Sequence, residues 1–166
     1  DNLPVCKIGE SRQAASDLRV PNFEDFDQSH FGDLQGGYIV GATPFALHSR
    51  RLANVEFDVI LFDEASQVTL PLAIMGMLAA NKYIFIGDEN QLPPVTVLAQ
   101  EDDPEKVAQL SIFSFLAGRG DETMLNITYR LNDILSDWPS RNFYRSELKP
   151  SPEAAGRRLM LSGSHS

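Results

Sequence analysis

Four short apolar runs, separated by helix-like segments, constrain the fold of this 166-residue chain more than any other feature. The runs occupy residues 38–40, 57–62, 83–86 and 124–128. Strands that are covered on both faces of a parallel sheet are typically apolar throughout, as these runs are. The segments with the length and composition of helices are 45–53, 69–80, 101–116 and 132–144. Strands that alternate with helices predict βαβ units and a mostly parallel sheet, so the expected fold class is α/β.

Local signals predict where the helices begin and end. Pro44 suits the first position of a helix, because its missing N–H needs no partner there. Asn132 is a typical N-cap residue for a helix that runs towards Tyr144. Within that helix, Pro139 is expected to produce a kink or a restart.

The composition indicates one globular domain without a membrane segment. Hydrophobic residues make up 43% of the chain and charged residues 22%, which is enough apolar material for one core. No apolar run approaches the roughly 18 residues that span a bilayer. The N-terminal residues DNLPVCKIGE show no secretory leader. The single cysteine, Cys6, excludes an internal disulfide and suits a reducing, intracellular compartment.

Charge is distributed unevenly along the chain. There are 14 Lys and Arg residues against 23 Asp and Glu residues, a net charge of −9, which argues against a protein that coats nucleic acid. The acidic-aromatic stretch 22–33 suits a solvated surface loop better than a partner-binding segment. The tail is mildly basic, and a solvated helix face accounts for it better than phosphate contacts do. Its basic residues are Arg141, Arg145, Lys149, Arg157 and Arg158.

Two adjacent carboxylates, Asp63 and Glu64, come directly after the apolar run at 57–62. In a parallel α/β sheet, ligands bind beyond the carboxyl ends of the strands, where these side chains are expected. One carboxylate there can hold Mg²⁺, and the next can orient and deprotonate an attacking water. Because side chains alternate along an extended backbone, we expect the two carboxylates to face different sides. An acid pair at the start of a loop is common, so the pair alone does not establish a site.

The run at 83–86 ends in the loop GDENQLPP, residues 87–94. Gly87 permits a tight exit from the strand, and Asp88 adds a carboxylate near the first two. The amide of Gln91 can bond a phosphate oxygen and a water together. The two prolines stiffen the segment after it. An ordinary proline-rich turn is the alternative interpretation of this loop.

Four motifs together resemble those of superfamily 1 helicases. FDEASQ (62–67), GDENQLPP (87–94) and YRLN (129–132) match motifs II, III and IIIa/IV in order and spacing, and GAT (41–43) is similar to the motif Ib region. The segment 134–148 resembles the one that the DEAxQ branch carries after its YR motif. That branch contains the nonsense-mediated-decay RNA helicase and the nuclease-helicase of DNA replication. The resemblance covers residues 37–150 and implies a RecA-like P-loop NTPase lobe.

The resemblance implies roles for the residues after the two central strands. Asp63 would coordinate Mg²⁺, and Glu64 would act as the catalytic base. Gln67 would bind near the phosphates or the water, and Asp88 would lie near the metal. Gln91 would sense the γ-phosphate of ATP.

The resemblance also implies roles for two motifs outside this pair. Tyr129 would lie near the adenine, and Arg130 would place its guanidinium on the γ-phosphate. Packing is the alternative role for Tyr129, and a surface or core-edge position is the alternative for Arg130. Thr43 and Pro44, which open a helix, would lie on the path of single-stranded DNA or RNA.

The sequence contains no Walker A loop, GxxxxGK with Ser or Thr after it. The resemblance therefore implies an incomplete first lobe that lacks the Walker A strand. Its parts are an irregular acidic segment (1–35), the partial lobe (36–150) and a tail (151–166). Without that strand, we expect residues 124–128 to move inward against 83–86, or the chain to self-associate. The chain alone is expected to be inactive.

The expected function is thus part of an ATP-dependent helicase motor that couples hydrolysis to single-strand translocation and unwinding. The alternatives are a non-catalytic module that binds nucleic acid or protein, and a different P-loop NTPase. Intact Asp63, Glu64, Gln91 and Arg130 favour the enzyme. No zinc site is expected, because the three histidines have no metal-ligand spacing; they are His30, His48 and His165.

Overall fold

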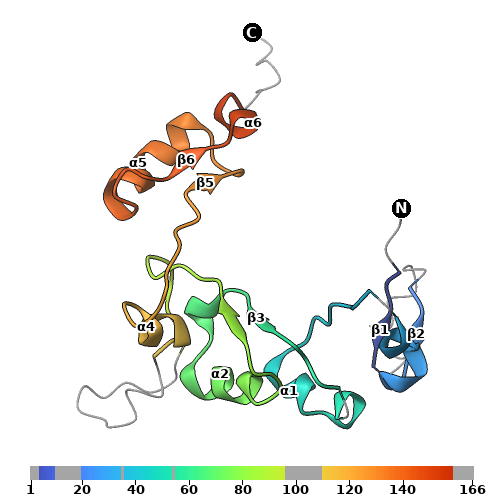
Figure 1. Cartoon of the computed structure of the whole chain (residues 1–166). Coiled ribbons are helices and arrows are strands. Elements are labelled where there is room, and N and C mark those ends of the chain that lie inside the picture. Colours follow the sequence, from blue (N-terminus) through green and yellow to red (C-terminus); the bar gives the residue numbers. More distant parts are fainter. Residues whose placement is uncertain (1–3, 10–19, 35, 54, 96–109, 159–166) are drawn as a thin grey trace. The chain divides into compact units, whose positions relative to one another are not determined.

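The computed structural model describes residues 4–9, 20–34, 36–53, 55–95 and 110–158 (Figure 1). The chain divides into two compact units, Asp1–Leu116 and Ala117–Ser166. Within the described ranges, no helix combines the length and the apolar character that crossing a bilayer requires.

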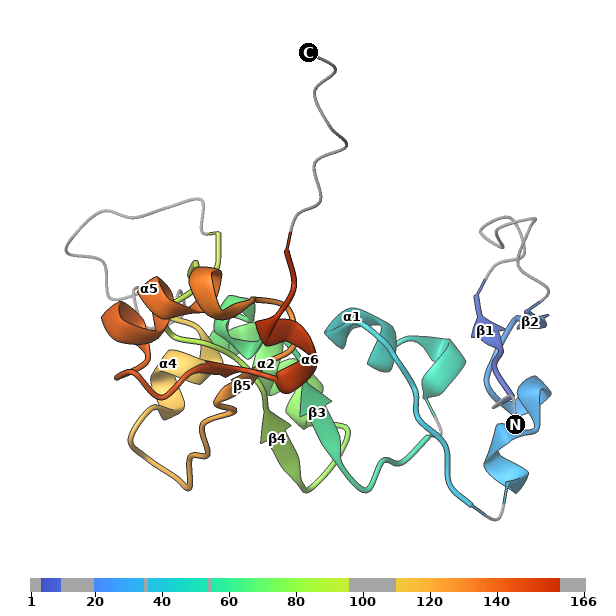
Figure 2. The same cartoon turned by 90° about the horizontal axis from the view of Figure 1, so that it is seen from above.

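The first unit is built on two parallel strands, β3 (Ile60–Phe62) and β4 (Tyr83–Phe85). Ile60 lies opposite Tyr83 and Phe62 opposite Phe85, and the two arrows run in the same direction in Figure 2. The 3-10 helix η5 (Ala65–Gln67) and the helix α2 (Leu70–Met77) connect the strands. The predicted parallel βαβ unit is therefore present, with strands shorter than the apolar runs.

One face of the β3–β4 pair is packed against helices. The rings of Phe62 and Phe85 stack with their centroids 4.9 Å apart. α2 can approach this face closely because Gly76 has no side chain. A Cβ at that position would lie 2.9 Å from the ring of Phe62. The buried cluster contains one residue from each of four elements: β3, η5, α2 and the helix α4 (Ile112–Leu116). These residues are Phe62, Ala65, Ala73 and Ile112.

The other face of the same pair is open to solvent, whereas the sequence predicted strands covered on both faces. Leu61 is 53% exposed and Ile84 is 50% exposed. The apolar pattern is therefore correct for strands, but only one of their faces has helices on it in the described part of the chain. The helix predicted at 101–116 is seen only as α4, since residues 101–109 lie outside the described ranges.

The residues before β3 form less regular structure than predicted. Residues 38–40 lie outside any strand, and Ile39 is 99% exposed, so the strand prediction there is wrong. An apolar run becomes a strand only when a neighbouring strand satisfies its backbone groups, and no pairing of this run occurs in the described ranges. The helix expected at 45–53 is divided into α1 (Pro44–Leu47) and the 3-10 helix η4 (Arg50–Leu52). Pro44 does occupy the first turn of α1, as predicted.

The N-terminal segment contains a parallel pair that the sequence did not predict, β1 (Lys7–Ile8) and β2 (Asn22–Phe23). The 3-10 helices η2 (Asp27–Ser29) and η3 (Phe31–Asp33) come after it. Phe26 anchors this acidic stretch: it is buried, and its ring lies 5.1 Å from that of Tyr38. Burial also raises the pKa of the Cys6 thiol beside β1.

The second unit pairs β5 (Ile127–Thr128) with β6 (Lys149–Pro150) in parallel. The helix α5 (Asp133–Phe143) connects them, and α6 (Pro152–Ala155) comes after β6. Asn132 caps α5 as predicted, while the helix continues through Pro139 without the predicted restart. β5 pairs with β6 in the second unit and β4 pairs with β3 in the first, and neither pairing tests the expected inward movement of residues 124–128, which stays a prediction. The parallel pairing with β6, which comes after α5 in the chain, gives hydrogen-bond partners to one edge of β5.

Candidate active site

A hollow of about 140 Å³ lies where β3 and β4 end. Three carboxylates and one amide contribute to its walls; the lining residues are Asp63, Glu64, Ile86, Gly87, Asp88 and Gln91. Two hydrogen bonds hold the strand ends together there, from Ile86 N to Phe62 O (2.9 Å) and from Ala65 N to Ile86 O (2.7 Å). The structure therefore brings the polar ends of the two central strands into one site.

The backbone turns sharply between the two adjacent acids. Glu64 has φ 53° and ψ 41°, the left-handed conformation, which costs a residue with a side chain about 1–2 kcal/mol. Asp63 Oδ1 accepts a hydrogen bond from Glu64 N at 3.0 Å, which stabilises this turn. The expected alternation along an extended strand is therefore wrong at Glu64. A turn, rather than strand geometry, brings both Asp63 and Glu64 into the lining of the hollow.

The loop after β4 is organised around Asp88. Its Oδ1 accepts from Asn90 N at 3.0 Å, and its Oδ2 accepts from Gln91 Nε2 at 3.0 Å. Gln91 N also donates to Asp88 O at 3.2 Å. The amide of Gln91 is thus oriented by a carboxylate within the same hollow, so movement of either side chain affects the other.

Gly87 is needed for space rather than for an unusual backbone angle. A Cβ at this position would lie 2.9 Å from Ser66 N and 2.9 Å from Phe113 Cδ2. The segment after β3, the end of β4 and α4 therefore meet at Gly87. Sequence reasoning attributed Gly87 to a tight strand exit and did not single out Phe113. The aromatic pair in IFSF (112–115) was the available signal for this contact.

Ser66, in the centre of the DEASQ segment, is 3% exposed, and its Oγ has no hydrogen-bond partner among the described residues. Replacing an unsatisfied buried hydroxyl by hydrogen removes a desolvation penalty. We therefore expect Ser66→Ala to leave the free energy of unfolding unchanged, or to raise it by up to about 1 kcal/mol, in urea denaturation.

Ser111→Ala is the matched control for this prediction. Ser111 is equally buried, but its Oγ lies 2.8 Å from Ser114 Oγ and accepts from Ser114 N at 3.0 Å. This variant loses bonds and is expected to destabilise the chain by about 1 kcal/mol. Equal losses in the two variants would mean that the Ser66 hydroxyl is bonded in solution.

The donor set of the hollow suits Mg²⁺. Within the described ranges, no group of three His, Cys, Asp or Glu side chains is arranged to hold a metal on its own. Mg²⁺ does not require such a group, because it prefers oxygen ligands and commonly takes one or two carboxylates, several waters and substrate phosphates. Asp63, Glu64 and Asp88 all line the hollow, and one or two of their carboxylates are enough for this ion, so the residue types present fit it.

Three other predicted site residues of the first unit lie outside the lining of the hollow. Gln67 is exposed, and its N–H donates to Glu64 O at 2.8 Å. Thr43 caps α1, its Oγ1 accepting from Ala46 N at 3.2 Å, and Pro44 comes next in the first turn. The end of α1 is joined to α2 by His48, whose Nε2 donates to Met75 O at 2.6 Å.

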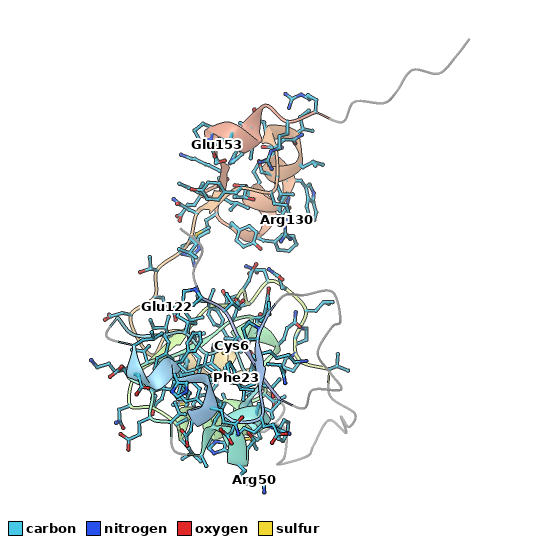
Figure 3. All side chains as sticks on the ribbon, turned by 90° about the vertical axis from the view of Figure 1, so that its right-hand side faces the viewer. Cys6, Phe23, Arg50, Glu122, Arg130 and Glu153 are labelled. Carbon is cyan, nitrogen blue, oxygen red and sulfur yellow. The ribbon has the colours of Figure 1, made fainter. Side chains whose placement is uncertain are left out.

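Tyr129 and Arg130 belong to the second unit, in the loop after β5. Arg130 is labelled in Figure 3. Both are exposed, Tyr129 to 64%. Arg130 N and Leu131 N each donate to Thr128 Oγ1 at 3.3 Å. Arg157 Nη1 also donates to Tyr129 O at 2.7 Å, a contact that sequence reasoning missed because 28 residues separate the two positions.

Comparisons with known proteins find a matching family and several longer relatives. Residues 19–99 match a family described as an AAA domain. DNA polymerase alpha-associated DNA helicase A from Schizosaccharomyces pombe is 36% identical over 125 residues, 74% of this chain and 18% of that protein. A homolog of Regulator of nonsense transcripts 1 from Drosophila melanogaster is 33% identical over 130 residues, 77% of this chain and 11% of that protein.

A third relative aligns with nearly the whole chain. The DNA replication ATP-dependent helicase/nuclease of Arabidopsis thaliana is 30% identical over 171 residues, which is 99% of this chain and 13% of that protein. The chain therefore spans less than a fifth of the length of the three relatives, of which it covers 18%, 11% and 13%.

The AAA match and the parallel βαβ unit define the class first, a P-loop NTPase-like α/β fold. The relatives then define the family: the chain belongs to the superfamily 1 helicases, in the branch of these relatives. The resemblance seen in the sequence motifs is thereby confirmed.

Proposed function

We propose that this chain forms part of the motor of an ATP-dependent helicase, and that the hollow is the catalytic side of its ATP site. One observation carries the proposal: the ends of β3 and β4 place Asp63, Glu64, Asp88 and Gln91 around a single hollow. The printed name of the Arabidopsis relative, an ATP-dependent helicase/nuclease, supports ATP as the substrate.

The three carboxylates have different roles in ATP hydrolysis. Asp63 holds Mg²⁺, which neutralises charge on the phosphates when it is bound. Glu64 orients the attacking water and accepts its proton as the general base. Asp88 would lie near the Mg²⁺ ion. Its Oδ2 accepts a hydrogen bond of 3.0 Å from Gln91 Nε2 and thereby orients the Gln91 amide.

The two amides and the residues of the YR motif take the remaining roles that the family resemblance implies. Gln91 senses the γ-phosphate with its amide. Gln67, whose backbone N–H is bonded to Glu64, binds near the phosphates or the attacking water. Tyr129 lies near the adenine, and Arg130 stabilises charge on the γ-phosphate. The exposure of both side chains supports this, because they are available to a ligand.

Single-stranded DNA or RNA is the proposed partner, with Thr43 and Pro44 on its path. The hydrogen bond from His48 to Met75 links this region to α2, the helix that connects β3 to β4 along the chain. We further propose that residues 36–150 belong to one incomplete RecA-like lobe, with the segment 1–35 before it and the tail 151–166 after it.

The incomplete lobe is supported by two features. The sequence has no Walker A loop, and Leu61 and Ile84 expose an apolar face on the central strands. Further elements of a lobe would cover such a face, which is also the surface through which the isolated chain would self-associate. The Walker A backbone and lysine cradle the β- and γ-phosphates, so a chain without them binds ATP poorly.

The test compares ATP hydrolysis by the full-length protein and by the 166-residue chain, with and without single-stranded DNA or RNA. We expect the full-length protein to hydrolyse ATP faster in the presence of single strands, and the chain alone to show negligible hydrolysis. Hydrolysis by the chain that Glu64→Gln abolishes would contradict the proposed inactivity. A full-length protein that binds nucleic acid without hydrolysing ATP would support the non-catalytic alternative.

A further inference from the structure

The loop that carries Tyr129 and Arg130 is held at both of its ends. At the start, Thr128 O accepts from Ser151 N at 2.8 Å, which continues the β5–β6 pairing. At the end, Asn132 Oδ1 caps α5 by accepting from Leu135 N at 2.9 Å. The loop is therefore a short, fixed connection between a strand and a helix.

Arg157 bonds this loop at two points. Its Nη1 donates to Tyr129 O at 2.7 Å, and its carbonyl oxygen accepts from Asn132 Nδ2 at 2.7 Å. Arg157 is itself held at the end of α6, because its N–H donates to Ala154 O at 3.1 Å. α6 begins at the buried Ser151, whose Oγ accepts from Ala154 N at 3.2 Å. The pairing of β6 and the cap of α6 thus place Arg157 against the loop.

These contacts fix the peptide group that precedes the Arg130 side chain. The carbonyl of Tyr129 and the N–H of Arg130 belong to one planar peptide unit. The carbonyl is bonded by Arg157 and the N–H by Thr128 Oγ1, so both polar groups of this unit have partners. Fixing a peptide plane at both groups fixes the direction of the N–Cα bond of Arg130, from which its side chain extends.

We propose that Arg157 is a positioning residue that acts on ATP hydrolysis through the Tyr129–Arg130 peptide. This rests on the proposed function, in which Arg130 stabilises charge on the γ-phosphate. The guanidinium of Arg157 donates to the backbone carbonyl of Tyr129. Its effect on hydrolysis is therefore indirect, through the position of Arg130. Its contribution is to hold Arg130 in the geometry that the transition state needs.

The structure supplies a matched control in the neighbouring Arg158. Arg158 Nη1 donates to Ala155 O at 3.2 Å and to Arg157 O at 2.9 Å, both within the same local turn. Arg157→Ala and Arg158→Ala remove the same charge from adjacent positions, but only Arg157→Ala removes a side-chain bond to the loop. Arg157→Lys keeps one donor, which is all that the bond to Tyr129 O uses.

The test is steady-state ATP hydrolysis by the full-length protein with saturating single-stranded DNA. We expect Arg157→Ala to lower kcat roughly 10- to 100-fold, as a misplaced catalytic group does. KM for ATP is expected to change less than kcat, because Arg130 acts on charge that develops in the transition state. Arg158→Ala keeps the original kcat, and Arg157→Lys recovers most of it. Arg157→Ala added to Arg130→Ala lowers kcat no further than Arg130→Ala alone.

Two results would overturn the role of Arg157 and leave the proposed function intact. One is equal kcat in the Arg157→Ala and Arg158→Ala proteins. The other is a further loss in the double variant, which would mean that Arg157 acts independently of Arg130. If Arg130→Ala itself keeps the original kcat, the proposed role of Arg130 fails, and the inference fails with it. Melting temperatures of all variants, measured in parallel, separate a loss of folding from a loss of positioning.

Discussion

Glu64→Gln in the full-length protein is expected to lower kcat for ATP hydrolysis by about 10²–10⁴-fold. The amide has nearly the same shape as the carboxylate but cannot accept the proton of the attacking water. The backbone turn at Glu64 depends on the Asp63 Oδ1 bond to its N–H, which the substitution retains. ATP binding is therefore expected to persist, and titration calorimetry beside steady-state kinetics separates the two quantities.

Glu89→Gln is the control for this variant. Glu89 is exposed in the loop after β4, is absent from the lining of the hollow, and loses the same charge on substitution. It is expected to keep the original kcat. If Glu64→Gln also retains its kcat within a fewfold range, Glu64 is not the base, and the assignment of the hollow loses its main catalytic group.

Gly87→Ala is expected to destabilise the first unit by about 1–3 kcal/mol, the usual cost of overpacking. The added Cβ meets the backbone N of Ser66 and the ring of Phe113, each at 2.9 Å, and a backbone atom cannot move aside as a flexible side chain can. The displacement also separates Asp88 from the acids after β3, so kcat falls as well. Urea denaturation measures the free energy of unfolding directly.

Gly41→Ala tests whether this cost comes from the contact rather than from any Gly-to-Ala change. A Cβ on Gly41 has nothing within 4 Å, so its substitution is expected to leave the free energy of unfolding nearly unchanged. Gly87→Ala with the stability of Gly41→Ala would show that α4 and the segment after β3 do not meet at Gly87 in solution.

The central part of the fold was predictable because its signals are local. The runs that contain β3 and β4 are apolar, and the long apolar segment between them forms α2. Asn132 is another local signal, since its side chain bonds a backbone N–H three residues later. Such patterns depend on neighbours within one or two turns, which a sequence shows directly.

The features that the sequence did not predict depend on contacts between distant residues or on an unusual local conformation. The run at 38–40 has the same apolar character as the other strands, but a strand forms only where a partner satisfies its backbone. The left-handed turn at Glu64 is uncommon for a residue with a side chain, so no propensity predicts it. The bond from Arg157 to Tyr129 joins two segments through the β5–β6 pairing.

The candidate site was predictable in its residue types but not in its geometry. The motifs identified Asp63, Glu64, Asp88 and Gln91, and these four residues line one hollow. Their arrangement depends on the turn at Glu64 and on the close approach at Gly87, which emerge only when strands, loop and α4 are packed together.

A structure of the full-length protein with Mg²⁺ and a non-hydrolysable ATP analogue tests the central claim most directly. We expect Mg²⁺ about 2.0–2.1 Å from its oxygen ligands, bound by Asp63 directly or through a water. We also expect the terminal phosphate beside Gln91, with Glu64 facing the position of the attacking water. A nucleotide bound elsewhere, with the hollow at the ends of β3 and β4 occupied only by solvent, would mean that this hollow is not the ATP site.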